Sequence, residues 1–240
     1  MIEVLLLSLF PAAGALISGL LALVFRLSAQ NVAFALHVGA GVVLGVVGVE
    51  ILPRALDADP PIVFLLAFVI GSIVFVVLDW AAEHLGKRFG GPDSGAAIGI
   101  VFGVGIDMLV DGMMLAAGYR LGEGLGLLLA LSLFVANSPT TFSTMATVRN
   151  DLSWRTSLGI AIAFPIIFVL GVPIGRLALS GQPQIVELAM LSFTAGVLVL
   201  VVVEGLIPEA HHLTRRQAGI SAMLFSIAFT AFAALSLYLG

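Results

Sequence analysis

Hydrophobic positions dominate the chain and fall into eight long runs, separated by short polar stretches. Each run holds roughly 20 mostly apolar residues, the length that an α-helix needs to cross a lipid bilayer. The pattern therefore predicts an all-α integral membrane protein with eight transmembrane helices. We expect these spans at residues 4–25, 32–52, 62–80, 96–119, 125–148, 157–179, 186–208 and 218–239.

The composition agrees with this pattern. Apolar residues make up 60% of the 240 residues and charged residues only 10%, whereas a soluble domain carries about 25% charged residues. Lipid is therefore the expected neighbour of most exposed side chains, and residues 1–240 are expected to form a single transmembrane domain. The sequence has no cysteine, which excludes thiolate metal sites and thiol catalysis. It also has no basic cluster typical of nucleic-acid binding.

The distribution of Lys and Arg predicts the orientation, because basic residues are enriched in cytoplasmic loops. The odd-numbered loops hold seven such residues and the even-numbered loops three. We therefore expect the odd loops in the cytoplasm and both termini outside the cell membrane. Glu3 stands where a signal peptide would carry basic residues, so the first run is expected to be a retained helix. The basic residues are Arg26, Lys87, Arg88, Arg149, Arg155, Arg215 and Arg216 in the odd loops, and Arg54, Arg120 and Arg176 in the even loops.

The second and seventh predicted spans share a sequence pattern. Ala40-Gly41-Val42, Val46-Val47, Pro53 and Ala55 recur 155 residues later as Ala195-Gly196-Val197, Val201-Val202, Pro208 and Ala210. Because these two spans cross in opposite directions, the similarity indicates an inverted-topology repeat, which is typical of transporters. Spans one to three are then expected to superimpose on spans six to eight, around spans four and five. Similar apolar composition without a repeat is the alternative.

Two acidic residues lie near the middle of the fourth predicted span. Asp107 and Asp111 are four residues apart, so they project from one face of the helix. An ionisable side chain at membrane depth costs about 2.5 kcal/mol or more, which makes it a candidate functional residue. Two neighbouring carboxylates repel each other unless a cation lies between them or they share a proton. A water-filled crevice without a substrate is the alternative.

The fifth predicted span carries a polar stripe that is expected to face this acid pair. Asn137, Thr140, Thr141 and Thr144 follow the i, i+3, i+4, i+7 spacing of one helix face. Pro139 lies within the stripe and frees the carbonyl oxygen of the fourth residue before it. We expect Asn137 and Thr140 to offer neutral oxygens to a cation, with Thr141 beside the pathway. The alternative is that the threonines bond to their own helix and serve packing alone.

Other polar residues near the ends of spans two and seven are candidates for an ion pathway. Glu50 is expected near the outer face, and His37 near the cytoplasmic end of the second span. Glu204, Glu209 and His211 approach the cytoplasmic end of the seventh span. Together with Thr141, these residues are expected to form an exit relay. A histidine near a membrane surface is also common as an interfacial residue.

The residues quoted above resemble the ZIP family of metal transporters. The resemblance covers nearly the whole chain and is best over residues 195–211, similar to the seventh span of the family, and 37–53, similar to its second. In the fourth span the family carries a His-Asn pair, two variable residues, an acid and a glycine. Here Asp107 and Met108 stand for the pair, and Asp111-Gly112 match. The resemblance implies transport of a divalent cation of the zinc, manganese, iron and magnesium class, without a resident cofactor, by a homodimer.

The sequence departs from the family mainly in its histidines. In the fifth span only Asn137 and Pro139 fit the family pattern, and Val172 replaces the acid of the sixth span. The oxygen ligands that remain suit Mg²⁺, Mn²⁺ or Ca²⁺ better than Zn²⁺, whereas the sulfur of Met108 is a soft ligand. The expected metal site is therefore Asp107, Met108, Asp111, Asn137 and Thr140. In the third loop, the candidate metal ligands are reduced to Glu83, His84 and Asp93.

Two other functions remain open at this stage. A ZIP-like protein without transport activity would bind metal or act as a regulator. An intramembrane enzyme is the other alternative, because the segment from Asp107 to Gly112 is similar to the aspartate motif of CDP-alcohol phosphotransferases. That motif has two residues between its first acids instead of three and needs a second aspartate pair, which span five lacks. We therefore expect a transporter and not an enzyme.

Overall fold

The fold is known from a computed structural model that describes residues 2–57, 59–213 and 218–239; side chains are not described at 83, 85–96, 218, 220, 221 and 239. Arg215 and Arg216, which carry part of the predicted orientation, lie outside the described residues, as do the side chains of Lys87 and Arg88. Within the described part of the chain the structure is all-helical, as predicted.

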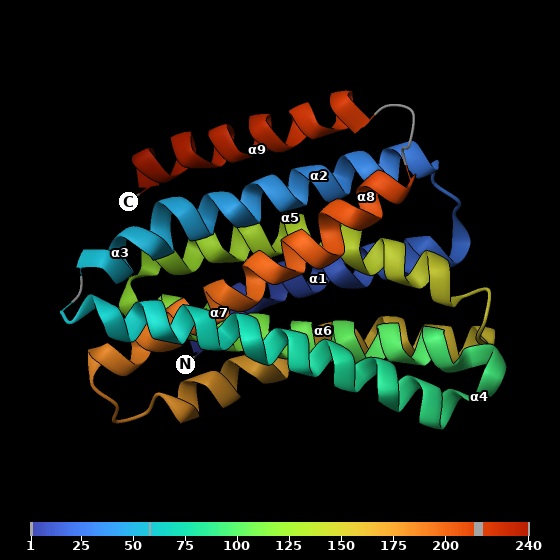
Figure 1. The fold of residues 1–240 in the computed structure, drawn as a ribbon, viewed down its shortest axis with the longest axis horizontal. Helices are drawn as coiled ribbons and strands as arrows, with labels where there is room; N and C mark the ends of the chain where they lie inside the picture. The colour runs from blue at the N-terminus through green and yellow to red at the C-terminus, as the bar shows by residue number, and fades with distance from the viewer. Residues whose placement is uncertain (1, 58, 214–217, 240) are drawn as a thin grey trace.

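The helices lie side by side along one long axis (Figure 1). The elements are α1 (Ile2–Val24), α2 (Ala29–Gly45), the π-helix η1 (Val46–Ile51), α3 (Leu52–Asp57), α4 (Pro61–Leu121), α5 (Glu123–Val148), α6 (Trp154–Ala178), α7 (Gln184–Leu200), the π-helix η2 (Val201–Leu206), α8 (Ile207–Leu213) and α9 (Ala218–Leu239). Seven helical stretches of the described chain are long and apolar enough to cross a membrane. They fit a multi-pass membrane protein. The apolar part of α9 in the described chain, Ala222–Tyr238, is shorter.

The chain between the third and fourth predicted spans differs from the prediction. We expected a loop after residue 80, but the backbone is helical from Pro61 to Leu121. Residues 81–88 are mostly good helix formers, which explains why the helix continues past Trp80. The two apolar stretches of α4 are Pro61–Ala82 and Ala97–Leu121, and both helix ends reach the beginning of α7. Phe64 lines a pocket with Ser192, and Arg120 pairs with Glu187, so α4 turns back on itself.

The two π-helices occur just before a proline. Pro53 is the second residue of α3, and Pro208 is the second residue of α8. A proline inside a helix donates no backbone hydrogen bond, and its ring clashes with the carbonyl of the fourth residue before it. Widening the preceding turn from α to π geometry relieves this clash. The two prolines therefore account for both irregular segments.

Three consecutive segments recur at a constant spacing. The segments α7, η2 and α8 begin 155 residues after α2, η1 and α3, at positions 184, 201 and 207 against 29, 46 and 52. The two copies run in opposite directions (Figure 1). The end of the first copy meets the beginning of the second, because Val47 and Ser192 line one pocket. The beginning of the first meets the end of the second, because His37 lies against His211.

Gly41 and Gly196, which are also 155 residues apart, each lie against the backbone of a neighbouring helix. A Cβ atom on Gly41 would lie 2.3 Å from the carbonyl oxygen of Phe225 in α9, and one on Gly196 would lie 2.0 Å from that of Phe68 in α4. Both distances are far too short, so each glycine is required for close backbone contact. The first half of α4 thus packs on α7 as α9 packs on α2.

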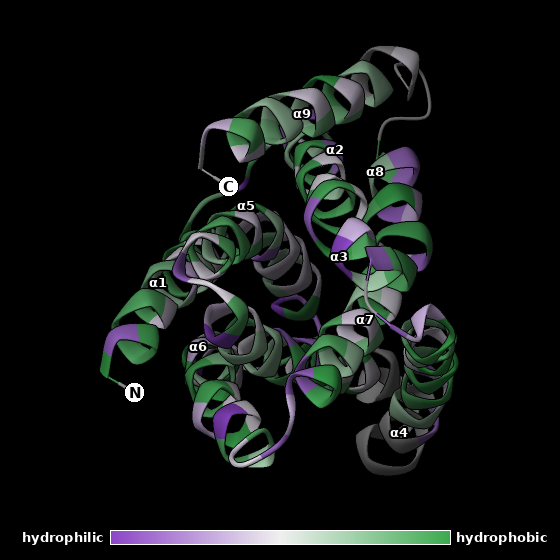
Figure 2. Ribbon diagram, turned by 90° about the vertical axis from the view of Figure 1, so that its left-hand side faces the viewer, coloured by the Kyte–Doolittle hydropathy of each residue, from purple (hydrophilic) through white to green (hydrophobic). Residues whose placement is uncertain are grey.

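The helix α5 lies among α1, α2 and α4 and is largely buried. Outward-facing positions of the surrounding helices carry large exposed apolar side chains such as Ile73, Ile166 and Leu170. Seen end-on in Figure 2, most of the ribbon has hydrophobic colours, and many of the hydrophilic stretches lie near helix ends. This distribution matches a lipid-facing surface with a buried central helix that can hold polar groups.

Candidate cation site

The centre of the candidate site is a buried hydrogen bond between α4 and α5. Asn137 Nδ2 donates to Asp111 Oδ2 at 2.8 Å, and the two residues are only 4% and 1% exposed. Because an ionised carboxylate can only accept hydrogen bonds, the amide must present its NH₂ group to it. The structure thus joins the fourth-span acid to the fifth-span amide, as the spacing of the polar residues predicted.

The acid pair is incompletely satisfied by the protein. Asp111 Oδ1 and Asp107 Oδ1 are buried, and neither has a hydrogen-bond partner in the described chain. An unpaired carboxylate oxygen in an apolar surrounding is costly unless a cation or a proton compensates its charge. Both free oxygens belong to acids one helical turn apart on α4. The arrangement can therefore bind a cation with two carboxylates.

The position of Asp111 is fixed by a close helix crossing beside it. A Cβ atom on Gly112 would lie 2.1 Å from the carbonyl oxygen of Phe168, and one on Gly171 would lie 2.3 Å from that of Leu109. The backbones of α4 and α6 therefore touch at this level, which only glycine allows. The crossing holds the helical turn that presents Asp111 to α5.

On α5, the polar stripe contains a proline that disrupts the preceding helical turn, and α2 packs against this turn. Pro139 leaves the carbonyl of Val135 without its usual helical donor. A Cβ atom on Gly39 would lie 3.4 Å from that carbonyl oxygen and 3.2 Å from the Cα of Ala136. The absence of a side chain at Gly39 thus lets the backbone of α2 cover the proline-loosened turn that carries Asn137.

Three other predicted site residues have surroundings of their own. The Thr140 hydroxyl donates to the carbonyl of Ala136 at 2.8 Å, so its hydrogen goes to its own helix, while the oxygen keeps lone pairs for a cation. Thr141 is fully buried, and its hydroxyl has no hydrogen-bond partner in the described part of the chain. Met108 is fully buried in the apolar core. The roles of these three residues stay predictions.

A second group of polar residues lies where α2, α5 and α8 meet. His37 is 2% exposed, and its ring centre is 5.3 Å from that of His211. The Ser143 hydroxyl donates to Glu209 at 3.1 Å. Three of the predicted pathway residues are thus close to this junction. Ser143 was missed, although its i+3 spacing from Thr140 places it on the neighbouring turn of the polar stripe.

The remaining predicted pathway acids, Glu50 and Glu204, differ sharply in their exposure. Glu50 is 5% exposed, pairs with Arg54 at 2.9 Å and accepts a hydrogen bond from Ser236 of α9. Glu204 lies in η2 and is exposed. The partners of Glu50 were also missed, although the i, i+4 spacing to Arg54 is a signal for an ion pair. Glu50 therefore has a structural partner on each of its oxygens.

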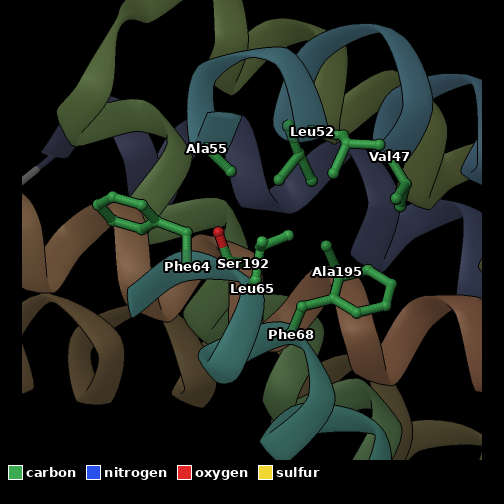
Figure 3. Close-up of a pocket in the computed structure, with 9 residues that line it drawn as sticks. Val47, Leu52, Ala55, Phe64, Leu65, Phe68, Ser192 and Ala195 are labelled. Atoms are coloured by element: carbon green, nitrogen blue, oxygen red, sulfur yellow. The ribbon is translucent and has the colours of Figure 1, made fainter. Parts of the chain in front are cut away.

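A pocket between η1, α3, α4 and α7 does not suit an ion. Eight of its nine lining side chains are apolar, including Val47, Phe64 and Phe68. Figure 3 shows these side chains around the hydroxyl of Ser192, which is buried and has no hydrogen-bond partner among the described residues. A single hydroxyl group cannot replace the hydration shell of a cation, so the pocket lies outside the candidate ion pathway.

Among the described residues, no three His, Asp or Glu side chains are close enough to hold one metal ion. A cation between α4 and α5 would thus have the two carboxylates as its protein ligands, with Asn137 holding Asp111 through the NH₂ group of its amide. In comparisons with known proteins, the sequence matches no family model and no curated protein. The resemblance to ZIP transporters therefore stays a prediction that is based on the quoted residues.

Proposed function

We propose that the protein transports divalent metal cations across a membrane, with Asp107, Asp111 and Asn137 as the central binding site. The observation that carries this proposal is the pair of buried carboxylate oxygens that have no hydrogen-bond partner among the described residues, next to a buried amide. A divalent cation compensates two carboxylates at once, which a single proton does not. The site lies between two helices within the apolar part of the chain, where a charged group without function is not expected.

The ligand types favour a hard or borderline cation. Carboxylate oxygens are ligands that Mg²⁺, Mn²⁺ and Ca²⁺ prefer, and no imidazole is among the site residues. Water molecules would complete the coordination, because the described protein offers fewer than three acidic or imidazole ligands at one place. Such a site binds and releases ions more readily than a closed structural site. We therefore propose Mn²⁺ or Mg²⁺ as better substrates than Zn²⁺.

An inverted repeat is the proposed basis of transport. The equal spacing of α2–η1–α3 and α7–η2–α8, their opposite directions, and the equivalent glycines Gly41 and Gly196 support it. The repeat would comprise eight spans with α9 as the last, around the second half of α4 and α5. Alternating access then requires one half to move against the other around a fixed central site. Outward termini and a homodimer remain part of the proposal.

The proposed route from the central site follows α5. Ser143 is six residues beyond Asn137, which corresponds to about 9 Å along the helix. Its hydroxyl contacts Glu209, which lies on α8 with His211. An ion that leaves the acid pair would therefore meet these polar groups one and a half turns further along. Glu50, which has its own partners, is not on this route.

Uptake by proteoliposomes tests the proposal directly. Purified protein should accumulate Mn²⁺ in vesicles loaded with a metal-sensitive dye, and Mg²⁺, Ca²⁺ and Zn²⁺ should be compared at equal concentration. Asp107→Asn and Asp111→Asn should each reduce uptake at least tenfold, because each removes one of two ligand charges. Uptake should also decrease at low pH, since protons compete for the carboxylates. Variants that transport as well as the unmodified protein would contradict the assignment of this site.

A binding or regulatory function without transport is the second candidate. It is favoured by the small number of strong ligands in the described chain. The two candidates differ in one measurement. A binding protein should be stabilised by Mn²⁺ in detergent through Asp111 but should produce no time-dependent accumulation inside vesicles.

A further inference from the structure

His37 is buried with one ring nitrogen unused. Its Nδ1 lies 2.9 Å from the carbonyl oxygen of Ala33, and because a carbonyl only accepts, Nδ1 must carry the hydrogen. Nε2 is buried without a partner in the described chain. The neutral ring therefore keeps its lone pair on Nε2. A metal-binding histidine has this same arrangement, in which one ring nitrogen donates to a carbonyl and the other holds the metal.

The second histidine of the junction is placed to bind the same ion. The ring centre of His211 lies 5.3 Å from that of His37, and the ring planes are tilted by 48°. Two imidazoles on one tetrahedral ion, with metal–nitrogen bonds of about 2.0–2.1 Å, have ring centres roughly 5 Å apart. A ring-centre separation of this size fits a shared ion when one nitrogen of each ring points to the same position between the rings. His211 is exposed, so an ion can reach the pair from outside the bundle.

We propose that His37 and His211 form a second metal site, which takes a borderline transition-metal cation such as Zn²⁺, Co²⁺ or Ni²⁺. Imidazole nitrogen suits these ions, whereas it is a poor ligand for Mg²⁺ and Ca²⁺. The site is built from α2 and α8, and no residue of the acid pair belongs to it. Two protein ligands leave the other coordination positions to water, so binding should be reversible.

This second site goes beyond the proposed transport function and does not depend on it. The acid pair offers oxygen ligands between α4 and α5, whereas the histidine pair offers nitrogen ligands between α2 and α8. One chain would thus hold two sites with opposite metal preferences. The histidine pair would sense or retain a transition metal even if no ion were transported.

Direct Co²⁺ binding tests the site, because nitrogen ligands change the visible absorption of Co²⁺. The protein should be purified without a histidine tag, in an Asp107→Asn/Asp111→Asn background that removes the acid pair. The chain has four histidines, so a His84→Ala/His212→Ala variant retains only the proposed pair. This variant should bind Co²⁺ with unchanged spectrum and affinity. His211→Ala and His37→Gln should each weaken binding at least tenfold.

These variants distinguish the proposed pair from the two remaining histidines and from a loss of folding. The His211→Ala variant should stay folded because its side chain is exposed, and the elution volume on size exclusion checks this. If the His84→Ala/His212→Ala variant loses Co²⁺ binding, or if His211→Ala binds as tightly as its parent, the histidine pair is not a metal site. Failure of Mn²⁺ uptake by the unmodified protein would contradict transport and leave the Co²⁺ result unaffected.

Discussion

Asp111 and Glu50 are both buried carboxylates in apolar helices, but their surroundings are opposite. Glu50 has a partner on each oxygen, with Arg54 on one and Ser236 on the other. Asp111 has the neutral amide of Asn137 on one oxygen, and its other oxygen has no partner in the part of the chain that the structure describes. A buried acid with a cationic partner from the protein is stabilised within the fold. One without such a partner requires a cation or a proton from outside.

The comparison teaches that burial of an acid does not identify a functional site. The two residues are 1% and 5% exposed, so exposure does not separate them. The difference lies in the charge balance around each carboxylate. Glu50 links η1 to α9 through Ser236, whereas the Asp111 carboxyl group has no cationic side chain of the described chain beside it. Substitutions at the two places should therefore act on different properties, namely stability and ion binding.

The largest expected effect is a difference between variants of Asp111 and Glu50 in how far Mn²⁺ raises the free energy of unfolding. In the unmodified protein, Mn²⁺ at about 100 times its Kd should raise the free energy of unfolding by about 2.7 kcal/mol. Asp111→Asn should lower the affinity at least tenfold, so at the same Mn²⁺ concentration the increase should fall to about 1.4 kcal/mol or less. Glu50→Gln should lower the starting stability but keep the metal-induced increase. Thermal unfolding in detergent, with and without Mn²⁺, measures both. If the two variants lost the Mn²⁺-induced increase in the free energy of unfolding to the same extent, the proposed difference between Asp111 and Glu50 would be wrong.

A smaller effect is expected from Gly112→Ala, which does not touch the ligands. The new methyl group would lie 2.1 Å from the carbonyl of Phe168, so α4 and α6 must move apart, at a cost of about 1–3 kcal/mol. The movement displaces Asp111 and should weaken Mn²⁺ binding several-fold. Gly103→Ala is the matched control, because nothing lies within 4 Å of a Cβ there. If both variants bind Mn²⁺ as the parent does, the crossing does not position the acid.

Arg54→Ala should change stability and leave ion binding nearly unaffected. It removes the cation next to buried Glu50, but the Arg54 side chain is 37% exposed, so water already weakens the ion pair. We therefore expect a loss of roughly 1–2 kcal/mol in the free energy of unfolding. Arg54→Lys should recover part of this loss. Thermal unfolding and Mn²⁺ titration should be run on the same samples. A tenfold loss of Mn²⁺ affinity would place Glu50 on the ion route after all.

The smallest effect is expected from Thr140→Val, which preserves shape and removes a hydroxyl. This hydroxyl bonds to the carbonyl of Ala136 within α5, so Mn²⁺ affinity and uptake should change less than about twofold. Thr140→Ser serves as a control that retains the hydroxyl. A tenfold loss of uptake in Thr140→Val alone would show that Thr140 turns towards the acids when a metal is bound.

The sequence was sufficient to predict what depends on spacing. The apolar runs gave the helices, the common pattern of residues gave the spacing of 155, and the i, i+4 position of Asp111 with the polar stripe of α5 gave their contact. Features that depend on competition between neighbours were not predicted. The hydroxyl of Thr140 can bond to its own helix or across the interface, and only the packing decides between them. The loop expected after Trp80 is helical, and helix propensity accounts for this only over residues 81–88, because the glycines and the proline at 90–95 are poor helix formers.

The two π-helices have a consequence for the numbering of the repeat. A π turn contains one residue more than the α turn that it replaces, so it resembles an absorbed insertion. Because η1 and η2 both occupy the turn before Pro53 and Pro208, the spacing of 155 continues through them without a gap. If one copy lost a residue in its π-helix, this turn would revert to α geometry. The following helix, α3 or α8, would keep its position in the structure. In the proposed inverted repeat, these turns are therefore the places where the two copies would diverge in length without losing their alignment.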